Sequence, residues 1–490
     1  MISLLLISIP LLSGLVLFVV KDGGTARRTS LFSALLTLVA LAAGMTMNQP
    51  ELISYRTEWM PGLGSSFSLR LDGMGQLLCL LTALAFPLAF ISTWRADYTK
   101  ANNFFALMLL AQAGLMGVFL AADALLFYFF WELALIPMYF ICSQWGGERR
   151  IAVTFKFFIY TFVGSVLMLI AILSLYAKTP DRSFDLESFY RIVIGSREQG
   201  WHFWLFFLAF AIKMPVFPFH TWQPDTYEQS PTAATMILSA VMVKMGVFGI
   251  LRWLLPVLPV ASYQWGDVVM SLAVVGIVYA SLIAIRQDDL KRFVAYSSIA
   301  HVGLMAAAIF AENRSGMQGV MIQMFNHGIN IIGLWMVVEM VERRYGTRKI
   351  SELGGLARRA PVLATLLVII ALANIALPLT SGFPGEFLMI NGLLNSEATQ
   401  YRIWFTVFAA SGIVLAAVYT LNMIRKVFYG DTTPRTEAAV DISRNEKAAL
   451  WVVVAFVLAA GVYPQALLNV TNEISEFIWN KANVLPLLKK

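Results

Sequence analysis

Charged residues are scarce in this chain. Of its 490 residues only 13% are Asp, Glu, Lys or Arg, whereas 59% are hydrophobic, and the mean hydropathy is +0.71. This composition excludes a soluble globular protein that carries a single apolar helix, and it predicts a protein that lies largely inside a membrane. We therefore expect most of the chain to contact the lipid bilayer or other membrane-embedded protein.

Motifs for binding metals, redox centres and nucleotides are missing as well. The two cysteines, Cys79 and Cys142, stand in apolar segments, and the sequence has no C-x-x-C pair and no cluster of cysteine with histidine. This argues against an iron–sulfur cluster and a structural zinc site. Neither a G-x-G-x-x-G fingerprint nor a P-loop occurs, so nucleotide binding has no support. We predict no metal and no cofactor in this chain.

What the chain has in abundance is apolar runs long enough to cross a bilayer. The first run follows no basic segment, so we interpret it as a membrane helix and not as a signal peptide. We expect an all-α polytopic membrane protein with about fourteen transmembrane helices. They lie near residues 2–20, 29–47, 74–94, 103–121, 124–142, 151–176, 203–219, 233–252, 266–285, 292–310, 317–340, 361–390, 403–424 and 448–468.

The uneven distribution of lysine and arginine between the connections predicts the orientation. If the N-terminus lies outside, the connections on the cytoplasmic side carry 21 of these residues and those on the opposite side carry 12. Cytoplasmic connections are usually the more basic ones, so we expect both termini outside. The net charge of +7 then comes mostly from the basic connections and reflects the topology of the chain. We therefore predict no nucleic acid as a partner.

Two of the predicted spans are interrupted by proline. The seventh contains Pro215 and Pro218, and the twelfth contains Pro378 and Pro384. Unwound backbone is tolerated in a membrane only inside protein or beside water. Each break falls in the fourth span of a set of five, which predicts two inverted five-helix repeats. We divide the chain into an N-terminal three-helix segment (1–100), a first repeat (101–255), a second repeat (256–430) and a C-terminal helix with its tail (431–490).

Four charged residues lie deep inside apolar spans: Glu132, Lys213, Lys244 and Glu386. A charge at the bilayer centre costs at least about 2.5–3.5 kcal/mol on insertion scales, so such residues usually mark a path for ions or protons. Burial disfavours the charged form of a lysine, and a nearby carboxylate favours it. A lysine beside a movable carboxylate can therefore hold and release a proton near neutral pH. A static salt bridge between Glu132 and Lys213 is the alternative.

Two histidines, His301 and His327, stand near the middle of their spans. Histidine titrates close to physiological pH and suits a proton relay, while a hydrogen-bonded core histidine is the alternative. Lys156 lies about one and a half turns into its helix and is either a relay group or an anchor whose ammonium reaches the membrane surface. His220 and Asp225 follow the broken seventh span, where we expect them to line an entrance.

Five stretches of the sequence resemble the proton-pumping, antiporter-like subunits of respiratory complex I and the related multisubunit Na⁺/H⁺ antiporters. The resemblance extends over nearly the whole chain. Two features set the chain apart from the L-type and N-type members: Glu386 stands where they usually have lysine, and only about 22 residues follow the last span, too few for the long lateral helix of the L type. The stretches are FFWELALIPMYF (129–140), KMPVFPFHTWQPD (213–225), SPTAATMILSAVMVKMGVFGILR (230–252), QDDLKRFVAYSSIAHVGLM (287–305) and GFPGEF (382–387).

The resemblance implies a role for each deeply placed residue. Glu132 would pair with Lys213, Lys244 would relay the proton, His301 and His327 would lie on a central axis, and Glu386 would be the terminal carboxylate near the exit. The function implied is proton translocation as a membrane subunit of an NADH:quinone oxidoreductase in the bacterial inner membrane, with both termini on the periplasmic side.

The resemblance also implies the surroundings of the chain. NADH, FMN, iron–sulfur clusters and quinone would belong to other subunits, and the neighbours in the membrane would be L-type and N-type subunits. A subunit of a multisubunit cation/proton antiporter is the alternative, against which Glu386 in place of lysine argues. A purely structural spacer is a third interpretation, but a spacer has no need of buried charges of both signs.

Overall fold

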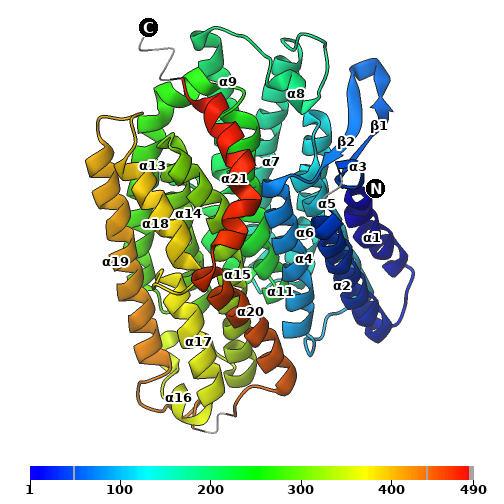
Figure 1. Ribbon diagram of the computed structural model, residues 1–490. Helices are drawn as coiled ribbons and strands as arrows, with labels where there is room; N and C mark the ends of the chain where they lie inside the picture. The colour runs from blue at the N-terminus through cyan, green and yellow to red at the C-terminus, as the bar shows by residue number, and fades with distance from the viewer. Residues whose placement is uncertain (48–49, 438–439, 485–490) are drawn as a thin grey trace.

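The computed structural model describes residues 1–47, 50–437 and 440–484. Most of these residues belong to helices that stand side by side as one bundle (Figure 1). The α-helices are α1 (Ile2–Leu17), α2 (Gly23–Met47), α3 (Pro50–Ile53), α4 (Gly73–Ser92), α5 (Ala101–Leu120), α6 (Ala124–Trp145), α7 (Arg150–Tyr176), α8 (Leu186–Phe189), α9 (Ser196–Lys213), α10 (Trp222–Gln229), α11 (Thr232–Ile237), α12 (Val243–Gly249), α13 (Pro259–Arg286), α14 (Leu290–Phe310), α15 (Arg314–Tyr345), α16 (Leu356–Arg359), α17 (Pro361–Asn374), α18 (Gly382–Leu394), α19 (Arg402–Val427), α20 (Arg444–Val462) and α21 (Gln465–Ala482).

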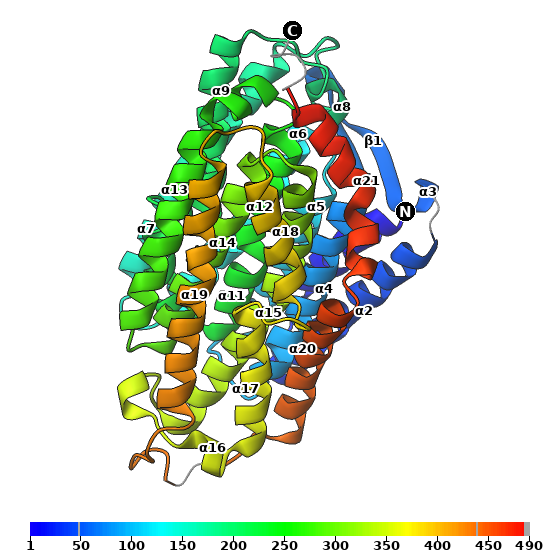
Figure 2. The same ribbon diagram turned by 60° about the vertical axis from the view of Figure 1, so that its left-hand side comes forward.

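The two ends of the bundle differ. One carries an antiparallel hairpin of β1 (Ser54–Met60) and β2 (Ser65–Arg70), and the other carries α16 (Figure 1). We call them the hairpin end and the α16 end. The ammonium group of Met1 donates a hydrogen bond to the Leu52 carbonyl at 3.0 Å, next to β1, and α21 also runs towards the hairpin end (Figure 2). Both ends of the described chain thus share one end of the bundle. The side of the membrane that this end faces stays a prediction.

The hairpin departs from the purely helical fold that we expected. In β1, Tyr55, Thr57 and Trp59 alternate with charged residues, and aromatic and β-branched residues favour strands. Tyr55 packs edge to face on Phe67 of β2, with ring centroids 6.2 Å apart. The mostly helical fold is confirmed, and residues 54–70 are a short exception in which a period of two residues replaces the helical period.

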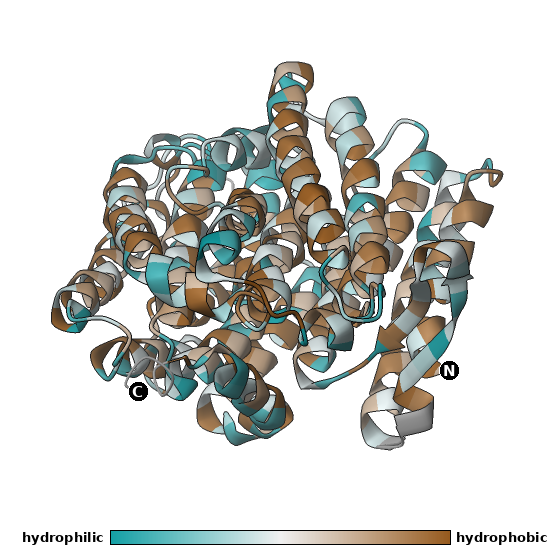
Figure 3. Ribbon diagram, turned by 90° about the horizontal axis from the view of Figure 1, so that it is seen from above, coloured by the Kyte–Doolittle hydropathy of each residue, from teal (hydrophilic) through white to brown (hydrophobic). Residues whose placement is uncertain are grey.

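Eleven of the described helices are long and apolar enough to cross a membrane on their own. Each predicted span falls on a helix or on a broken pair of helices, but α1 and α17 have only 16 and 14 residues, fewer than the roughly 20 that a bilayer requires. Large apolar side chains stay exposed on the outer helices, such as Ile151 on α7 and Trp404 on α19, and hydrophobic residues extend along the rim of the bundle (Figure 3). A multi-pass membrane protein is confirmed, while the number fourteen stays a prediction.

Both predicted breaks are present. α9 stops at Lys213 and the chain resumes as α10, and α17 stops at Asn374 before α18 begins. A side chain satisfies a freed carbonyl near each break: the Trp222 indole donates to the Ile212 carbonyl at 3.0 Å, and the Asn326 amide donates to the Ser381 carbonyl at 2.7 Å. The unwound backbone is thus held by protein, as a membrane interior demands.

Two matching caps show that the two sets of helices are inverted. The Asp123 side chain caps α6 by accepting from the Leu126 amide, and Asp289 caps α14 by accepting from the Arg292 amide. Each aspartate also forms an isolated β-bridge: Asp123 pairs with Asp185, which follows α7, and Asp289 pairs with Lys349, which follows α15. α6 starts at the hairpin end, whereas α14 starts at the α16 end, so the same local structure occurs twice with opposite direction. The residue boundaries of the repeats stay a prediction.

The eighth predicted span is continuous but irregular. α11 passes into a π-helical turn, η2 (Leu238–Met242), and α12 passes into a second one, η3 (Ile250–Leu254). π-helical turns are rare and often occur at functional sites. Lys244 lies on α12 between the two turns.

A helix that we did not expect follows the last predicted span. After α20, Pro464 begins α21, which buries Thr471, Ser475 and Ile478 and lies against α4 and α15 (Figure 2). The approach to α4 is close, because a Cβ at Gly73 would lie 1.8 Å from the Val470 carbonyl oxygen. The C-terminal tail is therefore an ordered amphipathic helix up to Ala482.

Candidate functional site

Glu132 and Lys213 lie on neighbouring helices of the first repeat. Lys213 is the last residue of α9, where the negative end of the helix dipole favours a cation. It is 2% exposed, and its Nζ has no hydrogen-bond partner among the described residues. This Nζ lies 5.6 Å from the ring centre of Trp131 on α6. Glu132, the next residue, is half-buried, and its Oε1 has no partner either.

The structure therefore shows Lys213 and Glu132 as separate groups. The static salt bridge that we considered for this pair is not formed in this conformation, since Lys213 Nζ makes no hydrogen bond to any described residue. The pairing of the two residues during function stays a prediction.

Lys244 lies at the centre of the bundle and is fully buried. Its Nζ donates a hydrogen bond to the Ser239 carbonyl, inside η2, at 3.0 Å. The same Nζ lies 2.9 Å from Nδ1 of His327 on α15. When Nδ1 accepts this hydrogen bond, a neutral His327 carries its own proton on Nε2. The two predicted relay residues are thus in direct contact.

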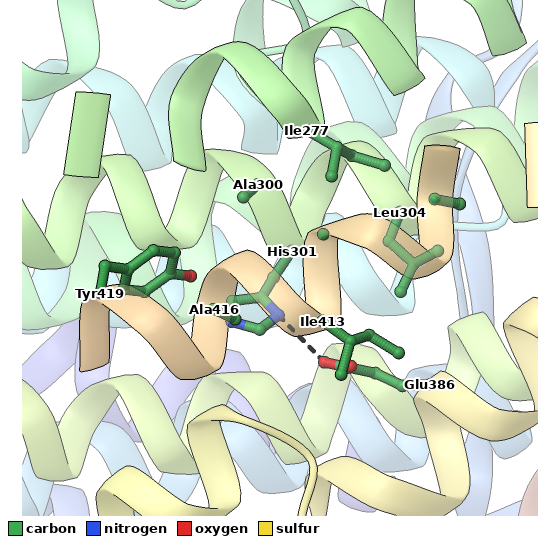
Figure 4. Close-up of a pocket in the computed structure, with 10 residues that line it drawn as sticks. Ile277, Ala300, His301, Leu304, Glu386, Ile413, Ala416 and Tyr419 are labelled. Atoms are coloured by element: carbon green, nitrogen blue, oxygen red, sulfur yellow. Dashed lines mark hydrogen bonds and ion pairs between the residues drawn. The ribbon is translucent and has the colours of Figure 1, made fainter. Parts of the chain in front are cut away.

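His301 and Glu386 extend this series of contacts. The rings of His301 and His327 have their centres 5.4 Å apart. Nδ1 of His301 lies 3.0 Å from Oε1 of Glu386 on α18 (Figure 4), and Gln323 donates to the same oxygen at 3.4 Å. His301 is 8% exposed and Glu386 is 3% exposed, so the pair is shielded from bulk water.

The residues expected at an entrance gather at the α16 end. Lys156 on α7 donates to Asp225 Oδ2 at 2.9 Å and to the Thr221 carbonyl at 2.8 Å. Asp225 on α10 also accepts from Arg292 on α14 at 3.0 Å and so joins the two repeats. His220 is 3% exposed, and its Nδ1 has no partner among the described residues. Lys156 is therefore part of an ion-pair network, and its role as relay group or anchor stays a prediction.

Buried polar atoms without a protein partner accompany the relay residues. Native proteins leave few such atoms unsatisfied, and ordered water usually serves those that protein does not reach. These atoms mark where water can connect the relay groups. Among the described residues they include atoms of Gln112, Gln223, Tyr227 and Ser239 in the first repeat, and of Ser298, His301, Gln323, Asn326, His327 and Ser381 in the second.

Two further buried groups were not predicted from the sequence. Arg252, in η3, is 2% exposed and binds both carboxylate oxygens of Asp72, at 2.5 and 2.8 Å. Tyr419 on α19 is 1% exposed, and its hydroxyl lies 3.0 Å from Ser297 Oγ. Arginine and tyrosine near the ends of apolar runs are common in membrane proteins, so their sequence positions carry no distinctive signal.

Metal-binding side chains do not cluster in the part of the chain that the structure describes. No group of three or more His, Cys, Asp and Glu residues there could hold a metal ion. The expectation that this chain carries no metal or cofactor stays a prediction.

Comparisons with known proteins agree with this architecture. Residues 121–416 match the model of a family described as NADH:quinone oxidoreductase/Mrp antiporter, TM. The NADH-quinone oxidoreductase subunit M of Rhodobacter capsulatus is 38% identical over 479 residues, which cover 93% of this chain and 92% of that protein.

Solved structures show the same fold. A chain of respiratory complex I from Thermus thermophilus with bound NADH has a TM-score of 0.91 at 28% identity, covering 99% of this chain and 100% of that one. A chain of the Mrp complex from Dietzia sp. DQ12-45-1b has a TM-score of 0.84 at 20% identity, covering 98% and 99%. At this low identity, the similarity to the Mrp complex chain shows only a shared fold.

The match to the family model includes every residue predicted to carry protons, from Glu132 to Glu386. It extends over more than half of the chain, and the identity to the relative extends over nearly all of it. The family inferred from the sequence is confirmed. The chain belongs to the NADH-quinone oxidoreductase subunit M family of antiporter-like membrane proteins.

Proposed function

We propose that this chain moves protons across a membrane as the M-type subunit of an NADH:quinone oxidoreductase. The observation that carries the proposal is the buried series from Lys244 through His327 and His301 to Glu386. Each member is a group that can gain and lose a proton. Burying such groups in a membrane is costly, and transport explains why the chain contains them.

The contacts suggest how a proton advances along this series. Lys244 Nζ gives a proton to Nδ1 of His327 along their 2.9 Å contact. His327 then releases the proton on Nε2, through a water molecule or a movement of the ring, to Nε2 of His301. His301 in turn gives the proton on Nδ1 to Glu386 Oε1, 3.0 Å away. Both histidines end neutral, each with its proton on the other nitrogen. Each returns to its starting tautomer when one ring nitrogen gives up its proton to water and the other takes one from water.

Lys213 supplies the next proton to Lys244 in this proposal. The ammonium of Lys213 is stabilised when Glu132 approaches it, and this stabilisation is weaker when the two groups are not in contact, as in the structure. Polar atoms of Gln223, Tyr227 and Ser239 that have no partner in the described part of the chain provide positions for water between the lysines. Lys156 and Asp225 connect this region to the α16 end.

The proposed orientation places the α16 end in the cytoplasm of a bacterial cell. The connections assigned to this end carry the excess of lysine and arginine, 21 against 12, as cytoplasmic connections do. Both termini then face the periplasm, and protons leave towards the hairpin end. Labelling of a C-terminal tag in intact spheroplasts should occur without permeabilisation, and labelling only after permeabilisation would reverse this orientation.

The proposed partners are L-type and N-type subunits on opposite flanks of the chain. α6 and α7 expose large apolar side chains on the flank where the half-buried Glu132 lies, and α13 and α19 expose them on the flank beside Glu386. A row of such subunits would bring the last relay residue of one close to the first of the next. NADH, FMN, iron–sulfur clusters and quinone belong to other subunits of the complex in this proposal.

Replacement of Lys244 by methionine tests the proposed function. The variant keeps the length of the side chain but removes the proton carrier. Lys244→Met should lower proton translocation coupled to NADH oxidation by about tenfold or more in inverted membrane vesicles with a normal amount of assembled complex. The matched control is Lys178→Met, at a half-exposed salt bridge near the hairpin end, which should pump normally. Normal pumping by Lys244→Met would overturn the proposal.

A further inference from the structure

Two small cavities lie on either side of Tyr419 in the second repeat. One is lined by His301 and Glu386 together with apolar residues of α13, α14 and α19 (Figure 4). The other is lined by Gln287, Asn422 and Lys426 towards the α16 end together with apolar residues. Each leaves about 10 Å³ for the centre of a water molecule, about the least that holds one water. Tyr419 is the residue that lines both cavities.

The Tyr419 hydroxyl belongs to a buried polar network. It lies 3.0 Å from Ser297 Oγ, which also accepts a hydrogen bond from the Asn374 amide at 3.1 Å. A hydroxyl group donates one hydrogen bond and accepts others at the same time. It can therefore take a proton from one side while it gives its own to the other. His301, with its Nε2 lacking a protein partner among the described residues, lines the same inner cavity as Tyr419 (Figure 4).

The direction of this polar route follows from the course of the helices. α14 runs from the α16 end towards the hairpin end, so Ser297 lies on the α16 side of His301. α19 runs the other way, so Lys426 lies on the α16 side of Tyr419. The outer cavity, with Gln287 and Lys426, therefore lies on the α16 side of Tyr419, and the inner cavity lies beside His301 and Glu386.

We propose that the Tyr419 hydroxyl carries protons from the α16 end to the His301–Glu386 pair, along a path separate from the one through Lys213 and Lys244. A proton from water in the outer cavity binds to Oη of Tyr419 as the hydroxyl proton leaves to water in the inner cavity and on to Nε2 of His301. The hydroxyl then rotates back, with no net change in Tyr419. This inference rests on the proposed function of His301 and Glu386.

Replacement of Tyr419 by phenylalanine tests the path, because it removes the hydroxyl and keeps the ring. We expect Tyr419→Phe to lower the protons translocated per NADH oxidised by about threefold or more in assembled complex. Ser297→Ala, which removes the hydroxyl partner, should lower them less. The control is Tyr190→Phe, since Tyr190 is also a buried tyrosine and donates to the Arg252 carbonyl at 3.1 Å away from the path. Normal proton translocation by Tyr419→Phe would overturn the inference.

A double variant separates this inference from the proposed role of Glu386. If Tyr419 feeds Glu386, then Tyr419→Phe combined with Glu386→Gln should translocate no fewer protons than Glu386→Gln alone. If the double variant translocates fewer protons than Glu386→Gln alone, by the factor that Tyr419→Phe causes by itself, then Tyr419 acts independently of Glu386 or through the structure. This result would overturn the inference. If Glu386→Gln pumps normally while Tyr419→Phe does not, the terminal role of Glu386 fails and the Tyr419 path to His301 stands.

Discussion

Lys213 is the residue whose surroundings decide how the relay begins. It ends a half-helix, lies 5.6 Å from the ring centre of Trp131 and has no hydrogen-bond partner among the described residues. The helix dipole and the aromatic face both favour a cation, but neither accepts a proton. In the proposed relay, control over the Lys213 proton therefore falls to Glu132 on the adjacent helix and to water.

Lys213→Arg should stop proton transfer even though it keeps the positive charge. A guanidinium group does not release its proton at any physiological pH. We expect Lys213→Arg and Lys213→Ala to lower proton translocation to a similar degree, by about tenfold or more, without loss of the assembled complex. Vesicle assays of both variants check this. Wild-type pumping by Lys213→Arg would show that Lys213 contributes only a charge.

Glu312, between α14 and α15 at the hairpin end, is a buried acid outside the spans. It is 6% exposed, and neither carboxylate oxygen has a partner among the described residues. Burial raises the pKa of its carboxyl group from 4.5 to about 8. Between these two values the folded protein holds a proton that the unfolded chain has released, so Glu312 makes the free energy of unfolding fall as pH rises from about 4.5 to about 8.

Glu312→Gln should remove this pH dependence, since an amide does not ionise. Above pH 8 we expect the variant to unfold at a higher temperature than the wild type, and below about pH 4.5 at a similar one, with a gain of about 1.4 kcal/mol for each unit of pKa shift relieved. Thermal unfolding of the purified complex across this range is the measurement. A wild type as stable as the variant above pH 8 would mean that ionised Glu312 finds a partner.

At the scale of single elements, the proline pattern predicted the broken spans but not where each relay residue stands within them. Proline disfavours helix at the preceding residue, so α9 stops at Lys213, which we had expected near the middle of its span. The π-helical turns around Lys244 were not predicted from the sequence. The contact of Lys244 with His327 was not predictable either, because the two residues lie far apart along the chain. The order of contacts at Lys244, His327, His301 and Glu386 likewise depends on packing between helices that periodicity does not reveal.

The hairpin and α21 were likewise not predicted from the sequence. Their segments are too short or too polar to read as membrane spans, and their structure depends on the neighbours they pack against, such as Gly73 of α4. Lys156 and Asp225 were predicted as candidates from their position near a break. Their ion pair, and its extension to Arg292 of the other repeat, required the fold.

The salt bridge between Asp72 and Arg252 ties the start of α4 to the end of the eighth span. Arg252→Met should destabilise the protein by about 3–5 kcal/mol, because it leaves a carboxylate unpaired in a largely buried site. The double variant Asp72→Asn, Arg252→Met should recover most of this loss, since asparagine can still cap α4. Thermal unfolding of both variants is the measurement. Equal losses in the single and double variants would mean that the arginine acts through packing.

At the scale of the whole molecule, two inverted sets of helices meet at a row of buried ionisable groups. The row passes from α12 through α15 and α14 to α18, so it crosses from the first repeat to the second at mid-bundle. Ion pairs at the α16 end, including that of Asp225 with Arg292, also connect the repeats. In the proposed function a proton enters in one repeat and leaves from the other, so that uptake and release are separated in space.

The fold alone does not identify the ion that is moved. The Mrp complex and complex I both share it, with TM-scores of 0.84 and 0.91. The residues favour protons, because the contacts join ammonium, imidazole and carboxylate groups instead of a cage of oxygen ligands suited to a hard cation. Ion identity is therefore part of the decisive experiment.

That experiment measures protons translocated per NADH oxidised by Glu386→Gln in assembled complex and in medium depleted of Na⁺. Glutamine keeps the shape of the side chain and its contacts with His301 and Gln323 but cannot ionise. We expect wild-type complex to pump without Na⁺, Glu386→Gln to translocate fewer protons per NADH, and Glu386→Lys to be affected less because an ammonium group also holds a proton reversibly. Normal pumping by Glu386→Gln, or a wild type that requires Na⁺, would contradict the account.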